Sequence, residues 1–334
     1  MNAKLPSQLK RFGDKALLNQ IEQSLELVEI ELQQATENSD KVVQQAARHL
    51  VDAGGKRVRP VLTLLTSLLG DGATKDVIDA AAVVELTHLA TLYHDDVMDD
   101  APTRRGVPTA QHVYGNSVAI LVGDLLLARA SRIGVALGIE AIDLQAKTFE
   151  RLCIGQLNET IGPKPDEDPI AHYIQVLADK TGSLIAASAK LGVMMSNAPH
   201  EYLLPLEEFG EKIGVAFQLI DDVIDISEAG PSGKTPGTDL RAGVPTMPVL
   251  LLRKRAATDP SAAALLAEID GDLSSDDRLA DVVAKLRNHP VADEAFEEAK
   301  RWANEAIAAL DALPEGQTKR ALIHFAQAVV DRDN

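Results

Sequence analysis

Hydrophobic residues recur every three or four positions along most of the chain, which is the period of an amphipathic helix. Near the start, this spacing predicts a helix over roughly residues 14–36, from Leu18, Ile21, Leu25, Val28 and Leu32. A second predicted helix ends near Val51, where Asp52-Ala53-Gly54-Gly55 follows. The N-terminal part of the chain is therefore expected to be helical.

The same period continues to the C-terminal end. It predicts helices over residues 75–99, 117–138, 141–160 and 206–227, with a further long helix after the loop 162–169. Shorter helical patterns follow near 262–266, 279–286 and 302–310, and residues 228–243 form a loop rich in glycine and proline. Because we find neither a convincing strand pattern nor a shift in composition, we predict one all-α domain over residues 1–334.

Two acidic clusters interrupt this apolar pattern. They are Asp95-Asp96-Val97-Met98-Asp99 and Asp221-Asp222-Val223-Ile224-Asp225. Carboxylates spaced i, i+1 and i+4 gather on one side of a helix, and at the end of an apolar stripe they need a cationic partner. Oxygen ligands that leave a coordination sphere open suit Mg²⁺, which shares substrate phosphates. The alternative is a solvated acidic helix face. We predict a magnesium site with these ligands: Asp95, Asp96, Asp99, Asp221, Asp222 and Asp225.

Basic residues occur in three segments of the sequence, one of them directly after the first acidic cluster. Lys56-Arg57-Val58-Arg59-Pro60 follows two glycines at a predicted helix start, which is favourable for binding an anion, although a solvated basic turn has the same pattern. Arg104 and Arg105 come just after the first acidic cluster, and guanidinium groups match phosphate oxygens. Lys180-Thr181-Gly182 lies inside a helix, where both a surface role and a binding role remain open. Together, acids and arginines indicate a diphosphate clamp.

Composition narrows the class of protein. The chain has 334 residues, 46% of them hydrophobic, and 50 acidic against 33 basic residues give a net charge of -17. A nucleic-acid partner is therefore not expected, and an anionic substrate needs local cations or metal ions. The single cysteine, Cys153, is expected to be a small buried hydrophobe. No apolar run is long enough for a transmembrane segment or a signal peptide, so we expect a soluble, cytoplasmic protein.

These motifs, taken in order, resemble those of the trans-isoprenyl diphosphate synthases, or polyprenyl synthetases. The resemblance covers nearly the full chain and rests on GGKRVRP, ELTHLATLYHDDVMDDAPTRRG, Lys180-Thr181, FQLIDDVID and GKTPGTDLRAG. It implies an all-helical bundle around a central cavity, usually a homodimer, with the two acidic motifs facing each other across the mouth of the cavity. It also implies isopentenyl diphosphate and an allylic prenyl diphosphate as substrates.

The resemblance assigns roles to individual residues. Metal binding and catalysis are implied for Asp95, Asp96, Asp99, Asp221 and Asp222, with Asp225 as a further ligand and Lys180 as a catalytic residue. The implied allylic diphosphate site is Arg104, Lys180, Thr181, Gln218 and Lys234. The implied isopentenyl diphosphate site is Lys56, Arg59, His88 and Arg105. The chain departs from the family at Val244, where many members have a second lysine, so the allylic clamp is expected to be weaker or to use Arg241.

The implied reaction is a head-to-tail condensation that begins when Mg²⁺ assists ionisation of the allylic diphosphate. In this family the residue five positions before the first aspartate often stops chain growth. Here it is Ala90, followed by Thr91, and the resemblance implies that these small side chains allow a medium- to long-chain all-trans product, which is expected to become a quinone side chain.

Four alternatives remain open. They are a short-chain geranylgeranyl diphosphate synthase, a non-catalytic subunit of a heteromeric synthase, a head-to-head synthase of the squalene type, and simple cation binding by the acids. The basic GGKRVRP segment argues against a head-to-head synthase, which needs no isopentenyl site. The complete acidic motifs and the arginine pair argue against a non-catalytic subunit.

Overall fold

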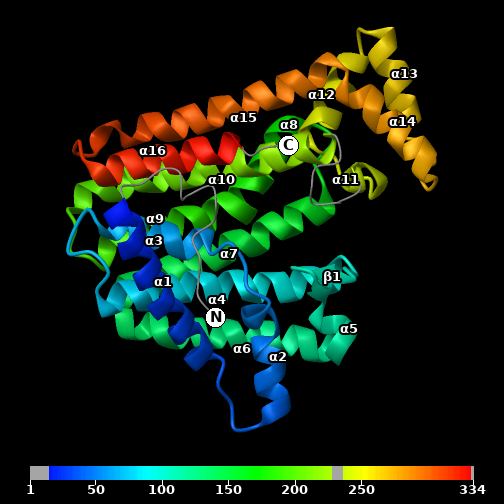
Figure 1. Ribbon diagram of the computed structural model, residues 1–334. Coiled ribbons are helices and arrows are strands. Elements are labelled where there is room, and N and C mark those ends of the chain that lie inside the picture. The colour runs from blue at the N-terminus through cyan, green and yellow to red at the C-terminus, as the bar shows by residue number, and fades with distance from the viewer. Residues whose placement is uncertain (1–14, 228–235, 332–334) are drawn as a thin grey trace. The chain divides into compact units, whose positions relative to one another are not determined.

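The computed structural model describes residues 15–227 and 236–331, and most of them lie in helices (Figure 1). The helices of the N-terminal part are α1 (Lys15–Ala35), α2 (Lys41–Asp52), α3 (Val58–Ser67), α4 (Lys75–Met98), α5 (Ala110–Tyr114), α6 (Asn116–Leu137) and α7 (Ile139–Ile161). Those that follow are α8 (Pro169–Leu177), α9 (Ser183–Met194), α10 (Leu203–Asp225), α11 (Thr238–Arg241), α12 (Met247–Ala256), α13 (Pro260–Ile269), α14 (Asp276–Arg287), α15 (Pro290–Ala309) and α16 (Gln317–Val330). The prediction of an all-α fold is confirmed.

One small hairpin was not predicted. Strands β1 (Thr103–Arg104) and β2 (Val107–Pro108) pair antiparallel, and Arg105 and Gly106 form the turn with φ of 54° and 78°. Two consecutive residues with positive φ are typical of the tight turn that suits a two-residue hairpin loop. Strands of two residues are too short to show the alternation of polar and apolar residues from which a strand is predicted.

The residues group into two compact units, which we describe separately. The described residues of the first are 15–151, 183–210 and 310–325, and those of the second are 152–182, 211–227, 236–309 and 326–331. In the first unit α4 packs against α1, α3, α6 and α9, and in Figure 1 α4 runs beside α6. Leu86, Leu89 and Tyr93 of α4 are fully buried. The single domain over residues 1–334 and the central cavity stay predictions.

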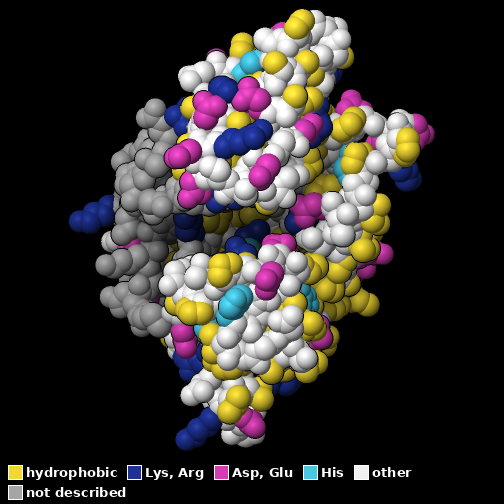
Figure 2. Space-filling model, turned by 90° about the vertical axis from the view of Figure 1, so that its right-hand side faces the viewer, with side chains coloured by type: hydrophobic (Ala, Val, Ile, Leu, Met, Phe, Trp, Pro, Cys, Tyr) yellow, Lys and Arg dark blue, Asp and Glu magenta, His cyan; other side chains and the backbone are white. Residues whose placement is uncertain are grey.

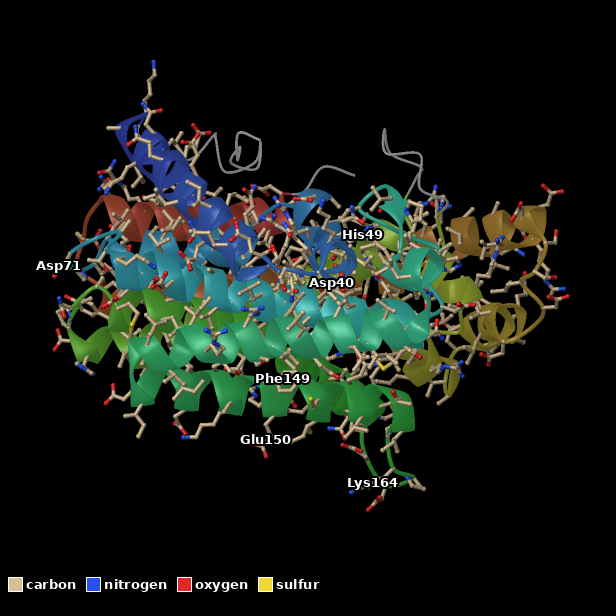
Figure 3. The ribbon with its side chains drawn as sticks, turned by 90° about the horizontal axis from the view of Figure 1, so that it is seen from below. Asp40, His49, Asp71, Phe149, Glu150 and Lys164 are labelled. Atoms are coloured by element: carbon tan, nitrogen blue, oxygen red, sulfur yellow. The ribbon has the colours of Figure 1, made fainter. Side chains whose placement is uncertain are left out.

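Specific contacts fix α2 against α4 in the first unit. Asp40, labelled in Figure 3, caps α2 by accepting hydrogen bonds from the amides of Val42 (2.8 Å) and Val43 (3.2 Å). Near the other end of α2, the Tyr93 hydroxyl donates to the Ala46 carbonyl (2.6 Å) and accepts from the Leu50 amide (3.3 Å). The loop that follows α2 is therefore anchored next to α4.

The second unit contains two clusters of buried hydrophobic residues. One joins α8, α10, α12 and α15 and includes Leu219, Ile220, Met247 and Ala299. The other joins the last turn of α10 to α11–α14 and includes Leu240, Leu252, Leu279 and Val282. Between α8 and α9 the helical run contains a π-helical turn, Ala178–Gly182, a feature that often marks a functional site.

The structure corrects the expectation for Cys153. Its side chain is exposed on α7, next to the exposed Ile154, because this face of the helix does not pack into the core of its unit. Acidic and basic side chains reach the surface beside hydrophobic ones over the face drawn in Figure 2. Among the described residues, no helix has the length and hydrophobicity needed to cross a membrane.

Candidate functional site

The first acidic motif lies at the C-terminal end of α4. Asp95 is partly exposed and Asp99 is exposed, whereas Asp96 is only 1% exposed. Arg104, from strand β1, donates to Asp96 Oδ1 through Nε at 2.7 Å, and its Nη2 lies 2.7 Å from the same oxygen. Burial raises the pKa of Asp96, and Arg104 opposes this effect. The hairpin therefore brings an arginine directly to the aspartates.

The acidic side chains fit a magnesium ion that is only partly enclosed by protein. Asp96 Oδ2 is buried and has no hydrogen-bond partner among the described residues, although a buried carboxylate oxygen normally has one. Across the described ranges, no three His, Cys, Asp or Glu side chains form a complete metal site. Mg²⁺ matches this arrangement because it binds carboxylate oxygens and keeps several waters or substrate phosphates.

Basic residues surround the loop between α2 and α3. Arg57 holds the left-handed conformation (φ 49°) just before α3, between Lys56 and Arg59. Arg59 Nε is buried without a hydrogen-bond partner among the described residues. Burial lowers the pKa of Arg59 to about 10, and Arg105 adds to this effect while Glu85 opposes it. An arginine with an unused buried donor is well suited to bind a phosphate oxygen.

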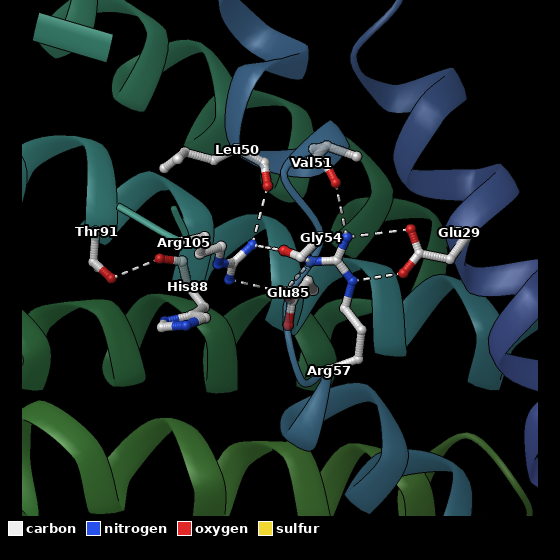
Figure 4. Close-up of polar contacts among 9 residues, drawn as sticks. All are labelled: Glu29, Leu50, Val51, Gly54, Arg57, Glu85, His88, Thr91 and Arg105. Atoms are coloured by element: carbon white, nitrogen blue, oxygen red, sulfur yellow. Dashed lines mark hydrogen bonds and ion pairs between the residues drawn. The ribbon is translucent and has the colours of Figure 1, made fainter. Parts of the chain in front are cut away.

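His88 lies two turns before Asp95 on α4. Burial holds the pKa of His88 well below its usual value, and the positive charges of Arg59 and Arg105 lower it further. The imidazole is therefore neutral at physiological pH, with one nitrogen able to donate a hydrogen bond and the other able to accept one. Figure 4 shows His88 beside Arg105, and the Thr91 hydroxyl donates to the His88 carbonyl at 2.8 Å.

The second acidic motif lies at the end of α10, in the second unit. Asp222 is buried, and its Oδ2 accepts from the Tyr173 hydroxyl (2.7 Å) and the Met247 amide (2.9 Å). Burial raises the pKa of Asp222 to about 7, an effect that these two donors oppose. Asp225 is also buried and accepts from the Thr238 hydroxyl at 2.7 Å.

Asp221 is the member of this motif that is partly exposed. Both Asp222 and Asp225 hold the part of the chain that follows residue 236: Asp225 contacts α11, and Asp222 contacts the first residue of α12. The three aspartates therefore differ in solvent exposure, which could not be predicted from their residue type.

Close helix packing positions Lys180 and Thr181, which are partly exposed on the π-helical turn. A Cβ at Gly214 of α10 would lie 2.6 Å from the Cα of Gly182, and a Cβ at Gly155 of α7 would lie 3.0 Å from the amide of Lys180. Glycine is thus required on both neighbouring helices, and Gln218 follows one turn after Gly214. Lys180 forms an ion pair with Glu159.

Two further predicted positions need comment. Lys234 lies outside the described residues. Arg241 forms an ion pair with the exposed Asp276, so its guanidinium already has an acidic partner, and Val244 is exposed. Of the residues implied to limit chain growth, Ala90 is fully buried and Thr91 is partly exposed.

The structure thus gathers the predicted residues into one set in each unit. The first unit contains Lys56, Arg59, His88, Asp95, Asp96, Asp99, Arg104 and Arg105. The second unit contains Lys180, Thr181, Gln218, Asp221, Asp222 and Asp225. That the two acidic motifs face each other remains a prediction from the sequence. Sequence reasoning missed Glu29, Glu85 and Tyr173, which hold site residues in place. A lone acid in an apolar run, as at Glu85, is the signal that a buried cation must be nearby.

Comparisons with known proteins show what the whole chain is similar to. The family model for polyprenyl synthetases matches residues 40–286. The nonaprenyl diphosphate synthase of Mycobacterium tuberculosis is 43% identical over 311 residues, covering 92% of this chain and 90% of that protein. Component 2 of the heptaprenyl diphosphate synthase of Geobacillus stearothermophilus is 33% identical over 321 residues, covering 96% and 99%.

Solved structures include a similar protein. The geranylgeranyl pyrophosphate synthase of Corynebacterium glutamicum, complexed with calcium and isoprenyl diphosphate, has a TM-score of 0.86 and 41% sequence identity. The comparison covers 96% of this chain and 98% of that one.

We expect His88→Gln to remove a pH-dependent contribution to stability. Because the folded pKa of His88 is depressed, its contribution is present above the unfolded pKa of about 6.5 and is lost as pH falls below it. Between pH 6 and 5, the unfolding free energy of the wild type should fall more steeply than that of the variant, by up to about 1.4 kcal/mol per pH unit.

Urea unfolding of the metal-free protein at several pH values measures this difference. His200→Gln, at an exposed histidine, is the control. Identical pH dependence in the wild type and His88→Gln would contradict the neutral state of His88.

Proposed function

Because the chain belongs to the polyprenyl synthetase family, we propose that it is a prenyltransferase that joins isopentenyl diphosphate head to tail to an allylic prenyl diphosphate. The observation that carries this proposal is the end of α4, where Arg104 of the hairpin contacts the buried Asp96, while the neighbouring Asp95 is partly exposed and Asp99 is exposed. Carboxylates with a metal ion and arginines with phosphate oxygens are complementary ways to hold a diphosphate. These carboxylates and arginines belong to the segments in which the sequence predicted a diphosphate site.

Isopentenyl diphosphate is the substrate we assign to Lys56, Arg59, His88 and Arg105. Two features of this set support the assignment: the buried, unused donor of Arg59 and the neutral imidazole of His88, which can donate without adding charge. A cluster of protein cations can neutralise a diphosphate without a metal ion. This substrate keeps its diphosphate throughout the reaction, so it needs firm binding and no activation.

The allylic diphosphate is the leaving group, and for it we propose the aspartates together with Arg104, Lys180, Thr181, Gln218 and Lys234. Asp95 and Asp99 on α4, and Asp221 on α10, are the more accessible carboxylates for Mg²⁺. Bound Mg²⁺ would neutralise the charge that develops on the departing diphosphate. The binding of calcium and isoprenyl diphosphate by the Corynebacterium relative supports a divalent ion in this role.

The protein itself binds the two diphosphates, orients them and shields the reacting atoms from water. Arg104 is held against Asp96, so its guanidinium reaches the leaving group from a fixed position. Removal of water protects the allylic cation until the double bond of isopentenyl diphosphate attacks it. The proton that is then lost goes, in our proposal, to the departing diphosphate.

For the product, we propose a medium- to long-chain all-trans polyprenyl diphosphate. The nonaprenyl and heptaprenyl relatives favour a long chain, whereas the geranylgeranyl relative represents the short-chain alternative. Small residues at Ala90 and Thr91 agree with continued growth. A quinone side chain as the destination of the product and a cytoplasmic location are further predictions from the sequence.

We also propose that the chain forms a homodimer through α5 and α6. One face of α6 packs on α4, while the other exposes hydrophobic residues, with Leu121 65% exposed. The exposed large hydrophobic residues of α5 and α6 are Val113, Val118, Ile120, Leu121 and Val135. A helix that is apolar on both sides needs a partner, and a second copy is the simplest. The alternative is a heteromer, as the name of the Geobacillus relative, component 2, suggests for that protein.

The first test is substitution of the accessible aspartates. We expect Asp95→Asn and Asp99→Asn each to lower turnover about 100-fold or more, because each removes charge that would hold a metal ion on the leaving group. Incorporation of labelled isopentenyl diphosphate into product measures turnover. Asp100→Asn, at the neighbouring exposed carboxylate, is the matched control. Near-normal turnover in both variants would refute the metal assignment.

Product length tests the assignment of Ala90. We expect Ala90→Phe to shorten the product, because an aromatic ring at this position would obstruct the growing chain. Chromatography of the dephosphorylated products gives the length distribution, with Ala90→Ser as the control of similar volume. An unchanged distribution would place the stop elsewhere, and geranylgeranyl diphosphate as the only wild-type product would favour the short-chain alternative.

Sedimentation tests the dimer. The purified wild type should have twice the 35.8 kDa mass of one chain, and Leu121→Glu should weaken association because it buries a charge in the apolar contact. Leu204→Glu, at a leucine that is 75% exposed on α10, is the matched control and should leave the mass unchanged. A monomeric wild type that is active would disprove the proposed homodimer.

A further inference from the structure

Arg57 is the cation in the basic loop that is entirely occupied by protein contacts (Figure 4). Its Nε donates to Glu29 (2.5 Å), and Nη2 donates to Glu29 (3.2 Å) and to the Val51 carbonyl (3.1 Å). Nη1 donates to Glu85 (2.8 Å) and to the Gly54 carbonyl (3.3 Å). A guanidinium has five N–H donors, and here each has an acceptor. Arg57 therefore has no donor left for a substrate.

These contacts fix the end of the loop at Lys56 and the first turn of α3, which carries Arg59. Arg57 has positive φ, a backbone conformation that is unfavourable for any residue other than glycine. Such a conformation persists only when the surrounding structure holds it. Its partners come from α1, from α4 and from the loop itself, at Glu29, Glu85 and Gly54. The backbone between the two neighbouring cations is thus tied to two helices through one buried side chain.

Glu85 also reaches a second arginine. It is 1% exposed, lies one turn before His88 on α4, and is 3.8 Å from Arg105 Nη2. Arg105 donates to the Leu50 carbonyl (3.0 Å) and to the Gly54 carbonyl, which also accepts from Arg57. The same buried carboxylate therefore contacts both the arginine that shapes the loop and the arginine of the hairpin turn.

Glycine makes this approach possible. A Cβ at Gly55 would lie 2.7 Å from Cζ of Arg105, so a larger residue would displace that guanidinium from the loop. Three guanidinium groups, those of Arg57, Arg59 and Arg105, thus share one small region, and their mutual repulsion needs a buried negative charge. Glu85 supplies that charge at the centre and Glu29 at the edge.

We propose that Glu85 and Arg57 are positioning residues for isopentenyl diphosphate. They hold Lys56, Arg59 and Arg105 in their binding arrangement and do not themselves touch the diphosphate. The proposal rests on the function proposed above, since it concerns the same binding site. It predicts a selective defect: loss of the Glu85 charge weakens binding of isopentenyl diphosphate and leaves use of the allylic substrate nearly unchanged.

Glu85→Gln tests the proposal because it keeps the shape of the side chain and removes its charge. We expect the KM for isopentenyl diphosphate to rise about tenfold or more and the KM for the allylic substrate to stay within about twofold. Asp79→Asn is the matched control, since Asp79 is a carboxylate on the same helix that pairs instead with Lys75. Both KM values of this control should match those of the wild type.

Glu29→Gln is the second variant, and it tests the positioning role if Glu85→Gln does not fold. It breaks the outer half of the Arg57 network and keeps Glu85, so we expect a smaller rise in the same KM. Folding of each variant is checked by circular dichroism and thermal unfolding. Folded variants with an unchanged KM for isopentenyl diphosphate, or with equal rises in both KM values, would overturn the positioning role.

Calorimetric titration with inorganic diphosphate in chelated buffer separates this proposal from the proposed function. Diphosphate should bind Glu85→Gln about tenfold more weakly than it binds the wild type. A wild type that turns over no isopentenyl diphosphate with any primer would refute the proposed function, whatever the titration shows. Equal diphosphate affinity in the wild type and in folded Glu85→Gln would refute the positioning role, whatever the turnover shows.

Discussion

The arrangement of the first unit depends on balancing charges that are largely removed from water. An unpaired buried charge costs several kcal/mol, so each buried arginine or carboxylate must have a partner close by. Helix α4 supplies such partners at helical spacing: Glu85 contacts Arg57, and Asp96 contacts Arg104. His88 lies between them and remains uncharged, since the neighbouring arginines and burial lower its pKa. One helix thus organises both the cationic and the acidic parts of the site.

This constraint explains two unusual backbone positions. Arg57 and Arg105 both have positive φ, which is rare for residues with a side chain. Each has its guanidinium bound to the carbonyl of Gly54, so the side-chain contacts that satisfy charge also hold the strained turns. Backbone strain of this kind is often found at functional sites, where a fixed geometry is needed. The two strained residues lie directly beside Lys56 and Arg104, which belong to the same unit.

Much of the fold could be predicted from the sequence, because the helical period is a local property. The predicted helix over 75–99 differs by one residue from α4 (Lys75–Met98), and the acidic motifs fall at the ends of α4 and α10 as their spacing indicates. Hairpin β1–β2 could not be predicted, because its residues are set by a turn and not by alternation. The exposure of Cys153 could not be predicted either, since an amphipathic pattern does not say which face meets solvent in a given packing.

The candidate site was predictable in residue type but not in detail. Sequence reasoning treated the three aspartates of each motif alike, whereas Asp96, Asp222 and Asp225 are buried and bound by protein donors. Glu29 escaped notice because its partner is distant in sequence, and only the folded chain brings it to Arg57. Long-range pairing of charges is decided by packing, which the period of a helix does not contain.

In the proposed mechanism, protein cations bind one diphosphate and carboxylates bind the other through a metal ion. Equilibrium titration of isopentenyl diphosphate and of geranyl diphosphate, each with Mg²⁺ and with a chelator, distinguishes the two modes of binding. We expect removal of Mg²⁺ to weaken the binding of geranyl diphosphate about a hundredfold and that of isopentenyl diphosphate by less than about threefold. Equal dependence of both ligands on Mg²⁺, or metal-independent binding of geranyl diphosphate, would contradict it.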